Sequence, residues 1–112
     1  MNIIMKCKDN IAFIEIFTEY LDNEKAKEVK RRVFDIIDNS TSKIVLNLSS
    51  IKFMDSIALT LIVAILKRIN SVNGELKFSP LAKQPEDLLN IIQLDRLLTF
   101  ISVDEFQKIR KI

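Results

Sequence analysis

The sequence has no histidine, no tryptophan, one cysteine and one glycine. Without histidine and without a cysteine pair, the usual zinc and acyl-transfer sites cannot be built. One glycine is too few for a phosphate-cradling loop, so the common nucleotide-hydrolysis signature is also missing. The 15 acidic residues formally leave room for a two-carboxylate hydrolase, but they show no convergent spacing. We expect a protein with no catalysis of its own, no cofactor and no metal site.

The sequence also has no recognisable export or membrane segment. The only cysteine, Cys7, cannot form a disulfide within the chain, and its apolar surroundings suggest a strand in which it is a small hydrophobe. The first residues lack the charged start and long apolar run of a secretory signal. The longest apolar-rich stretch, residues 57–69, is interrupted by polar side chains and is too short to span a bilayer. We therefore expect a cytoplasmic location and no membrane anchor.

The 112 residues are 48% hydrophobic and 29% charged, which is typical of a globular domain with a real core. A chain of this length forms one domain, residues 1–112. The 17 basic and 15 acidic residues are interspersed, so a nucleic-acid partner is not expected. A basic cluster lies in an amphipathic helical pattern and is interrupted by Glu28, so we interpret it as a solvated helix face. The cluster consists of Lys25, Lys27, Lys30, Arg31 and Arg32.

Hydrophobic periodicity predicts the first elements of the chain. Apolar residues on either side of the turn-like Lys8–Asn10 predict a β-hairpin made of residues 3–7 and 11–17. An amphipathic helix follows, capped by Asp22–Asn23 and ended by the polar segment 39–42. Residues 43–48 are apolar on both parities, which predicts a central strand covered on both faces.

The second half alternates between helices and strands. A largely buried helix is expected from Asp55–Ser56 to Asn73–Gly74. It is followed by a strand at 75–80, a helix at 86–94, a strand at 98–101 and a closing helix that opens at Ser102. This order predicts the α/β class, with a mostly parallel sheet opened by a β-hairpin and about four helices.

The pair Asp55–Ser56 is the feature with chemical content. It stands at a predicted helix start, where unpaired N–H groups and the helix dipole favour an anion. A phosphate on Ser56 would add nearly two negative charges beside Asp55 and would alter the local surface without requiring a new fold. Spacing alone favours a simpler interpretation, in which Asp55 is a helix cap and Ser56 an ordinary first-turn residue.

The residues around Asp55–Ser56 also resemble the signature of a known family. Phe53-Met54-Asp55-Ser56, following the strand and turn 44–51, resembles the signature of STAS domains, the sulfate-transporter and anti-sigma-factor-antagonist family. The resemblance runs over nearly the whole chain, including Leu21-Asp22 and the closing segment 94–106. Two departures stand out. Ile57-Ala58-Leu59-Thr60 replaces a small residue and Gly-Leu-Gly, and Glu19-Tyr20 replaces Gly-Glu.

The resemblance implies an anti-sigma factor antagonist with Ser56 as its phosphoacceptor. The implied partner is an anti-sigma factor that is also a serine kinase. The unphosphorylated form would bind this kinase and release a sigma factor, phosphorylation would end the binding, and a metal-dependent phosphatase would reset the chain. We expect the partner-binding surface to comprise Met54, Asp55, Ser56, Ile57 and Thr60, joined by Tyr20, Asp22 and Asn23.

Several alternatives remain open at this point. Met54 fits the core as well as the binding surface, because an apolar residue before a helix cap commonly packs as a staple. Ile57 and the absent glycines keep open a STAS scaffold or transporter-associated subunit that is never phosphorylated. A small-ligand binder or an enzyme on the same scaffold is the third alternative, which no polar constellation in the sequence supports.

Overall fold

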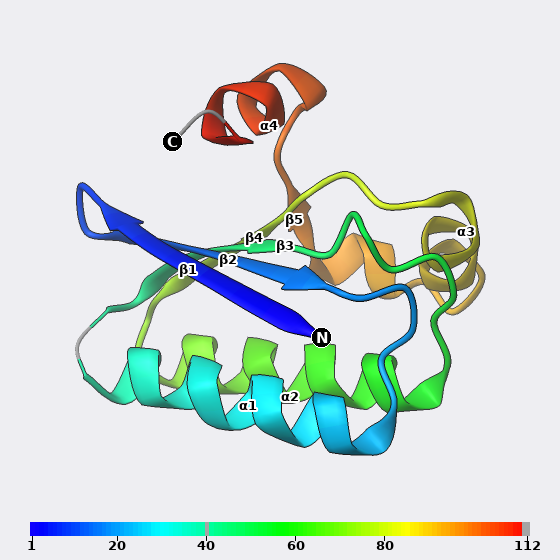
Figure 1. The fold of residues 1–112 in the computed structure, drawn as a ribbon, viewed down its shortest axis with the longest axis horizontal. Coiled ribbons are helices and arrows are strands. Elements are labelled where there is room, and N and C mark those ends of the chain that lie inside the picture. Colours follow the sequence, from blue (N-terminus) through cyan, green and yellow to red (C-terminus); the bar gives the residue numbers. More distant parts are fainter. Residues whose placement is uncertain (40, 111–112) are drawn as a thin grey trace.

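The computed structural model describes residues 1–39 and 41–110. Ser40, which the sequence places in the loop after the first helix, lies outside the described residues. In chain order (Figure 1) the elements are β1 (Asn2–Lys8), β2 (Ile11–Phe17), α1 (Asn23–Asp38), β3 (Lys43–Asn47), α2 (Ser56–Ser71), β4 (Glu75–Phe78), α3 (Lys83–Ile91), the 3₁₀ helix η1 (Leu94–Leu97), β5 (Thr99–Phe100) and α4 (Val103–Arg110).

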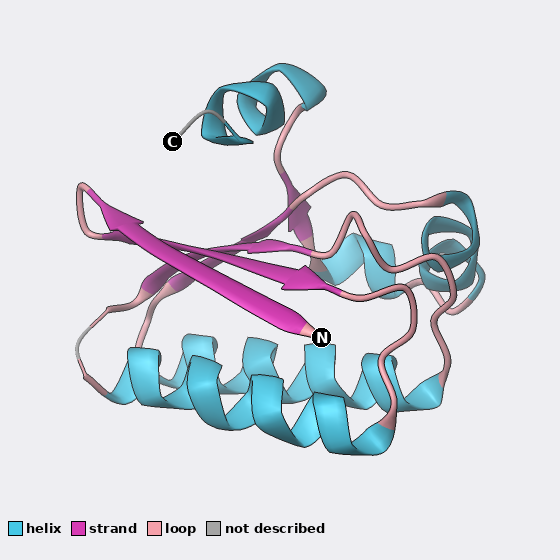
Figure 2. Cartoon of the chain, in the orientation of Figure 1, coloured by secondary structure: helices cyan, strands magenta, loops and turns pink. Residues whose placement is uncertain are grey.

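The strands form one sheet (Figure 2). Its strand order is β1-β2-β3-β4-β5. β1 and β2 are antiparallel, and every other neighbouring pair is parallel. The hairpin turn places Asp9 and Asn10 at φ values of 53° and 65°, a left-handed conformation that these residues tolerate and that two-residue hairpin loops require. The predicted α/β architecture, with four α-helices and a mostly parallel sheet opened by a hairpin, is confirmed.

The helices cover the two faces of the sheet unequally. α1 and α2 lie side by side against one face, and α4 lies on the other (Figure 1). The central strand β3 is accordingly buried on both sides. Ile44 and Leu46 belong to the main core, while Val45 packs with Ile101 and Phe106 in a smaller cluster. The predicted two-sided burial of this strand is therefore confirmed.

The last third of the chain differs from the sequence prediction in detail. α3 begins at Lys83 rather than at residue 86, because Pro85 fits in a first helical turn whose N–H groups need no helical partner. The helix ends at Ile91, and Gln93 adopts a left-handed φ of 62° before η1. The prediction for Cys7 was half wrong, because it lies in a strand but its side chain is exposed at the sheet edge.

None of the helices described is both long and apolar enough to cross a membrane.

The exit from α2 depends on the single glycine. A Cβ at Gly74 would lie 2.4 Å from the Ser42 carbonyl oxygen and 2.8 Å from Cγ1 of Ile69. We expect Gly74→Ala to lower the free energy of unfolding by about 1–3 kcal/mol, since the Ser42 backbone must move. Urea denaturation measures this change. The control is Asn73→Gly, which relieves a φ of 55° and should cost little. An unchanged midpoint for Gly74→Ala would contradict the packing described.

Candidate functional site

Two loops at the carboxyl ends of β2 and β3 lie next to each other. Tyr20 and Phe53 form an isolated parallel bridge, and their ring centroids are 6.1 Å apart. The carbonyl oxygen of Glu19 accepts hydrogen bonds from the backbone N–H groups of Lys52, at 2.9 Å, and Phe53, at 3.3 Å. The predicted proximity of the Tyr20 loop to the Asp55–Ser56 segment is confirmed.

Asp55 is the N-cap of α2 and uses both carboxylate oxygens. Its Oδ1 accepts the backbone N–H of Ile57 at 3.0 Å, and its Oδ2 accepts the Tyr20 hydroxyl at 2.7 Å. The predicted capping role is confirmed. The hydrogen bond to Asp55 is the main cause that raises the pKa of the Tyr20 phenol, followed by desolvation and by the negative charges of Asp55 and Asp22. Asp55 therefore joins the start of α2 to the loop between β2 and α1.

Ser56 is the first residue of α2, and its side chain is exposed. Its hydroxyl makes no hydrogen bond with the residues that the structure describes, whereas its carbonyl oxygen accepts the Thr60 hydroxyl at 2.8 Å. The hydroxyl thus faces solvent at the positive end of a 16-residue helix. A nucleophilic oxygen in this position is accessible to an external enzyme, and an anion attached to it would be favoured there.

The neighbours of Ser56 divide between surface and core. Met54 is only 1% exposed, so its side chain belongs to the core and cannot contribute to a binding surface. This corrects its place among the expected partner-contacting side chains. Ile57 is half-buried and packs against the main core. Ala58 is 2% exposed, so its small side chain satisfies the close packing for which the family commonly has glycine.

Gln84, in the first turn of α3, is a site residue that the sequence analysis missed. Its Nε2 donates to the Met54 carbonyl oxygen at 2.9 Å, and its Oε1 accepts the Met54 backbone N–H at 2.7 Å. The side-chain amide therefore pairs with the backbone immediately before Asp55. No sequence signal indicates this contact, because the two residues are 30 positions apart and belong to different elements.

The remaining predicted residues lie at the start of α1. Asp22 caps this helix, since its Oδ1 accepts the Lys25 backbone N–H at 2.9 Å. Asn23 lines a groove of about 270 Å³ between α1 and α2, together with Ser56, Ile57 and Thr60. The structure thus brings the predicted residues together at one end of the two helices, with the exception of the Met54 side chain.

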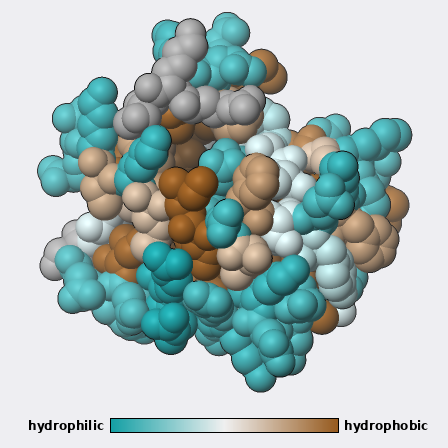
Figure 3. All heavy atoms as spheres, viewed as in Figure 1, coloured by the Kyte–Doolittle hydropathy of each residue, from teal (hydrophilic) through white to brown (hydrophobic). Residues whose placement is uncertain are grey.

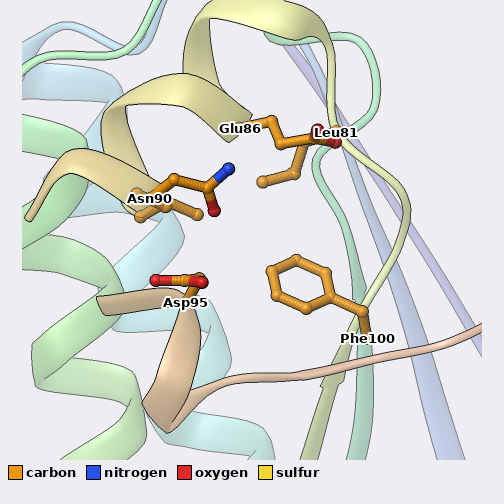
Figure 4. A pocket seen from close by; sticks show the side chains of 6 residues that line it. Leu81, Glu86, Asn90, Asp95 and Phe100 are labelled. Carbon is orange, nitrogen blue, oxygen red and sulfur yellow. The ribbon is translucent and has the colours of Figure 1, made fainter. Parts of the chain in front are cut away.

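A separate hollow of about 250 Å³ lies between α3, η1 and β5 (Figure 4). Asn90 and Asp95 lie across it from the Phe100 ring, and Glu86 lies beside Leu81. It shares no lining residue with the groove at Ser56. Within residues 1–39 and 41–110, no group of three or more histidine, cysteine, aspartate or glutamate side chains could hold a metal ion.

The chain is similar to known proteins both in sequence and in structure. The family model described as the STAS domain matches residues 2–106. A protein of Thermotoga neapolitana, provisionally named an anti-sigma factor antagonist, is 37% identical over 79 residues, which cover 70% of each sequence. A crystal structure from Thermotoga maritima with the same provisional name has a TM-score of 0.79 and 28% identity, over 95% of this chain and 92% of that one. Phosphorylated SpoIIAA of Bacillus has the same fold, with a TM-score of 0.74 and 15% identity over 96% and 97% of the two chains.

The hydrogen bond from Tyr20 to Asp55 predicts a pH-dependent stability. Tyr20→Phe removes the donor and keeps the ring, so we expect a lower free energy of unfolding than in the wild type at neutral pH. The folded-state pKa of the phenol is raised. The contribution of this hydrogen bond to the free energy of unfolding is therefore fully present below the unfolded-state pKa of about 10. It is lost as the pH rises through the folded-state pKa. The difference from the wild type should narrow in alkaline solution.

Urea denaturation of both proteins across this pH range measures the effect. Phe17→Leu, at an exposed aromatic residue of β2, is the control, and its difference from the wild type should not follow the phenol titration. A Tyr20→Phe difference that stays constant with pH would contradict the role given to the hydroxyl.

Proposed function

The chain belongs to the STAS domain family and is of the anti-sigma factor antagonist type, and we propose that its unphosphorylated form binds an anti-sigma factor serine kinase and so releases a sigma factor. The observation that carries this proposal is the exposed Ser56 hydroxyl at the start of α2, directly after a capping aspartate. The protein is then the substrate of the kinase, works in the cytoplasm and performs no catalysis itself.

Phosphorylation of Ser56 ends the binding in this proposal. The Ser56 hydroxyl oxygen attacks the γ-phosphorus of ATP bound to the kinase, ADP leaves, and the hydroxyl proton passes to a base of the kinase. The product carries nearly two negative charges beside Asp55. Repulsion and steric bulk then oppose the docked partner, while the first-turn N–H groups of α2 favour the phosphate. Hydrolysis by a metal-dependent phosphatase restores the hydroxyl.

The surface proposed for the partner surrounds this hydroxyl. It combines charged and polar groups of two helix starts with the exposed rings of Tyr20 and Phe53, which are 39% and 52% exposed. Exposed aromatic side chains beside polar groups are common in protein interfaces. The proposed contact residues are Tyr20, Asp22, Asn23, Phe53, Asp55, Ser56, Ile57 and Thr60.

A second function has a specific feature in its favour. The segment Ile57-Ala58-Leu59-Thr60 departs from the glycine-containing pattern of the family, and Ile57 stands directly beside the acceptor. A partner that packs on Ile57 without phosphorylating Ser56 would make the chain a constitutive STAS scaffold or a transporter-associated subunit. Phosphate incorporation separates this function from the first.

The experiment is intact-mass analysis after incubation with ATP and a lysate of the native host. We expect the wild type to gain one phosphate and Ser56→Ala to gain none. Ser71→Ala, at the far end of the same helix, is the control and should be modified like the wild type. If the wild type stays unmodified while a known kinase substrate in the same lysate is phosphorylated, the proposed control by phosphorylation of Ser56 is wrong. The scaffold function then replaces it.

A further inference from the structure

The groove beside Ser56 is formed by two helices that start at the same end of the molecule. α1 and α2 run side by side in the same direction (Figure 1). The groove has a volume of about 270 Å³, several times the share of about 30 Å³ that a water molecule takes in the liquid. Ala26 and Leu61 contribute apolar surface to it. The other lining residues that matter here are Asn23, Lys27, Lys30, Ser56, Ile57 and Thr60.

The α1 side of this groove carries two cations from the basic cluster that the sequence predicts as a solvated face. The helix is hydrophilic toward solvent, as predicted (Figure 3). Lys27 and Lys30, however, line the same groove as Ser56. The Lys30 ammonium lies 5.5 Å from the centre of the Phe34 ring. Lys27 makes no ion pair with any residue that the structure describes, so its charge is available.

The general geometry of helices favours a Lys27 side chain that extends toward the start of α2. The Cα–Cβ bonds of a helix tilt toward its N-terminus, so the Lys27 side chain leans toward the end at which α2 begins. Asn23, one turn earlier on α1, lines the groove together with Ser56. One turn is about 5.4 Å, a distance that the four-carbon stem of a lysine can cover.

The two capping carboxylates beside the groove are already engaged. Asp55 accepts hydrogen bonds from the Tyr20 hydroxyl and the Ile57 backbone, and Asp22 accepts one from the Lys25 backbone. The Lys25 ammonium contacts the Thr18 hydroxyl at 3.3 Å. The positive ends of two parallel helix dipoles meet beside these caps. An anion on Ser56 would therefore lie near two carboxylates held by hydrogen bonds and near Lys27, which lines the same groove and has no ion pair among the residues that the structure describes.

We propose that Lys27 binds the phosphate of phosphorylated Ser56 within the α1–α2 groove. This rests on the proposed function, since it requires Ser56 to be modified. The bond is a charge-assisted hydrogen bond from the ammonium to a phosphate oxygen. The phosphate then fills part of the groove and neutralises Lys27. A partner that recognises the unmodified groove loses both the space and the cation, which adds to the repulsion from Asp55.

The test installs phosphoserine at position 56 during protein synthesis and follows its second ionisation by phosphorus NMR. The ordinary pKa of this ionisation is about 6. A bound ammonium favours the dianion, so we expect the wild-type phosphate pKa to be lower by roughly half a unit or more. Lys27→Gln should remove most of this shift, and Lys27→Arg should retain it.

Arg32→Gln is the matched control. It removes one positive charge from α1 at a position that does not line the groove. It should leave the phosphate pKa near the wild-type value. If Lys27→Gln and Arg32→Gln raise the pKa equally, the effect is a general field and the proposed contact is wrong. An identical pKa in the wild type and Lys27→Gln overturns the proposal as well.

Two measures distinguish a wrong Lys27 contact from a variant that does not fold and from a chain that the host does not phosphorylate. Lys27→Met also removes the charge but keeps the aliphatic stem, so it serves if Lys27→Gln does not fold. Because phosphoserine is installed without a kinase, the titration does not depend on modification in the host. Absence of phosphate in the host lysate would contradict the proposed function, whereas an unshifted titration would contradict only the Lys27 contact.

Discussion

The two hydrogen bonds between the Gln84 side-chain amide and the Met54 backbone are the constraint on which the site depends. They hold the chain two residues before Ser56, at a point where the Met54 side chain is also buried. From the loop between β2 and α1, the Tyr20 hydroxyl donates a hydrogen bond to the Asp55 carboxylate. A buried side chain, a paired backbone and a shared carboxylate together determine where α2 starts. Ser56 is thereby presented on a structured segment, which lowers the ordering cost when a partner binds.

A phosphate on Ser56 can change the surface at the start of α2 without a change of fold. A phosphate adds nearly two negative charges, which offsets the formal net charge of +2 of the whole chain. The elements behind Ser56 do not have to move to accommodate it, since its side chain already faces solvent. Ala58 stands where the family commonly has the first of two glycines, and its methyl group fits within the main core.

Local patterns predicted most of the fold, and long-range contacts account for what they missed. The hairpin, the two-sided strand β3 and the caps Asp22 and Asp55 follow from periodicity and from capping chemistry within a few residues. The contact of Gln84 with Met54 spans 30 positions, and no local rule indicates it. The groove position of Lys27 could not be predicted either. It depends on how α1 is rotated against α2, whereas an amphipathic pattern indicates only which face of a helix is buried.

Hydrogen exchange at the Met54 and Ile57 amides tests most directly whether Ser56 is presented by a segment that is formed before modification. Both amides are bonded to side chains, Met54 to Gln84 and Ile57 to Asp55. We expect slow exchange at both positions in the unmodified chain and in the chain carrying phosphoserine at position 56. Exchange as fast as in an open loop, or a loss of protection at Met54 on phosphorylation, would contradict it.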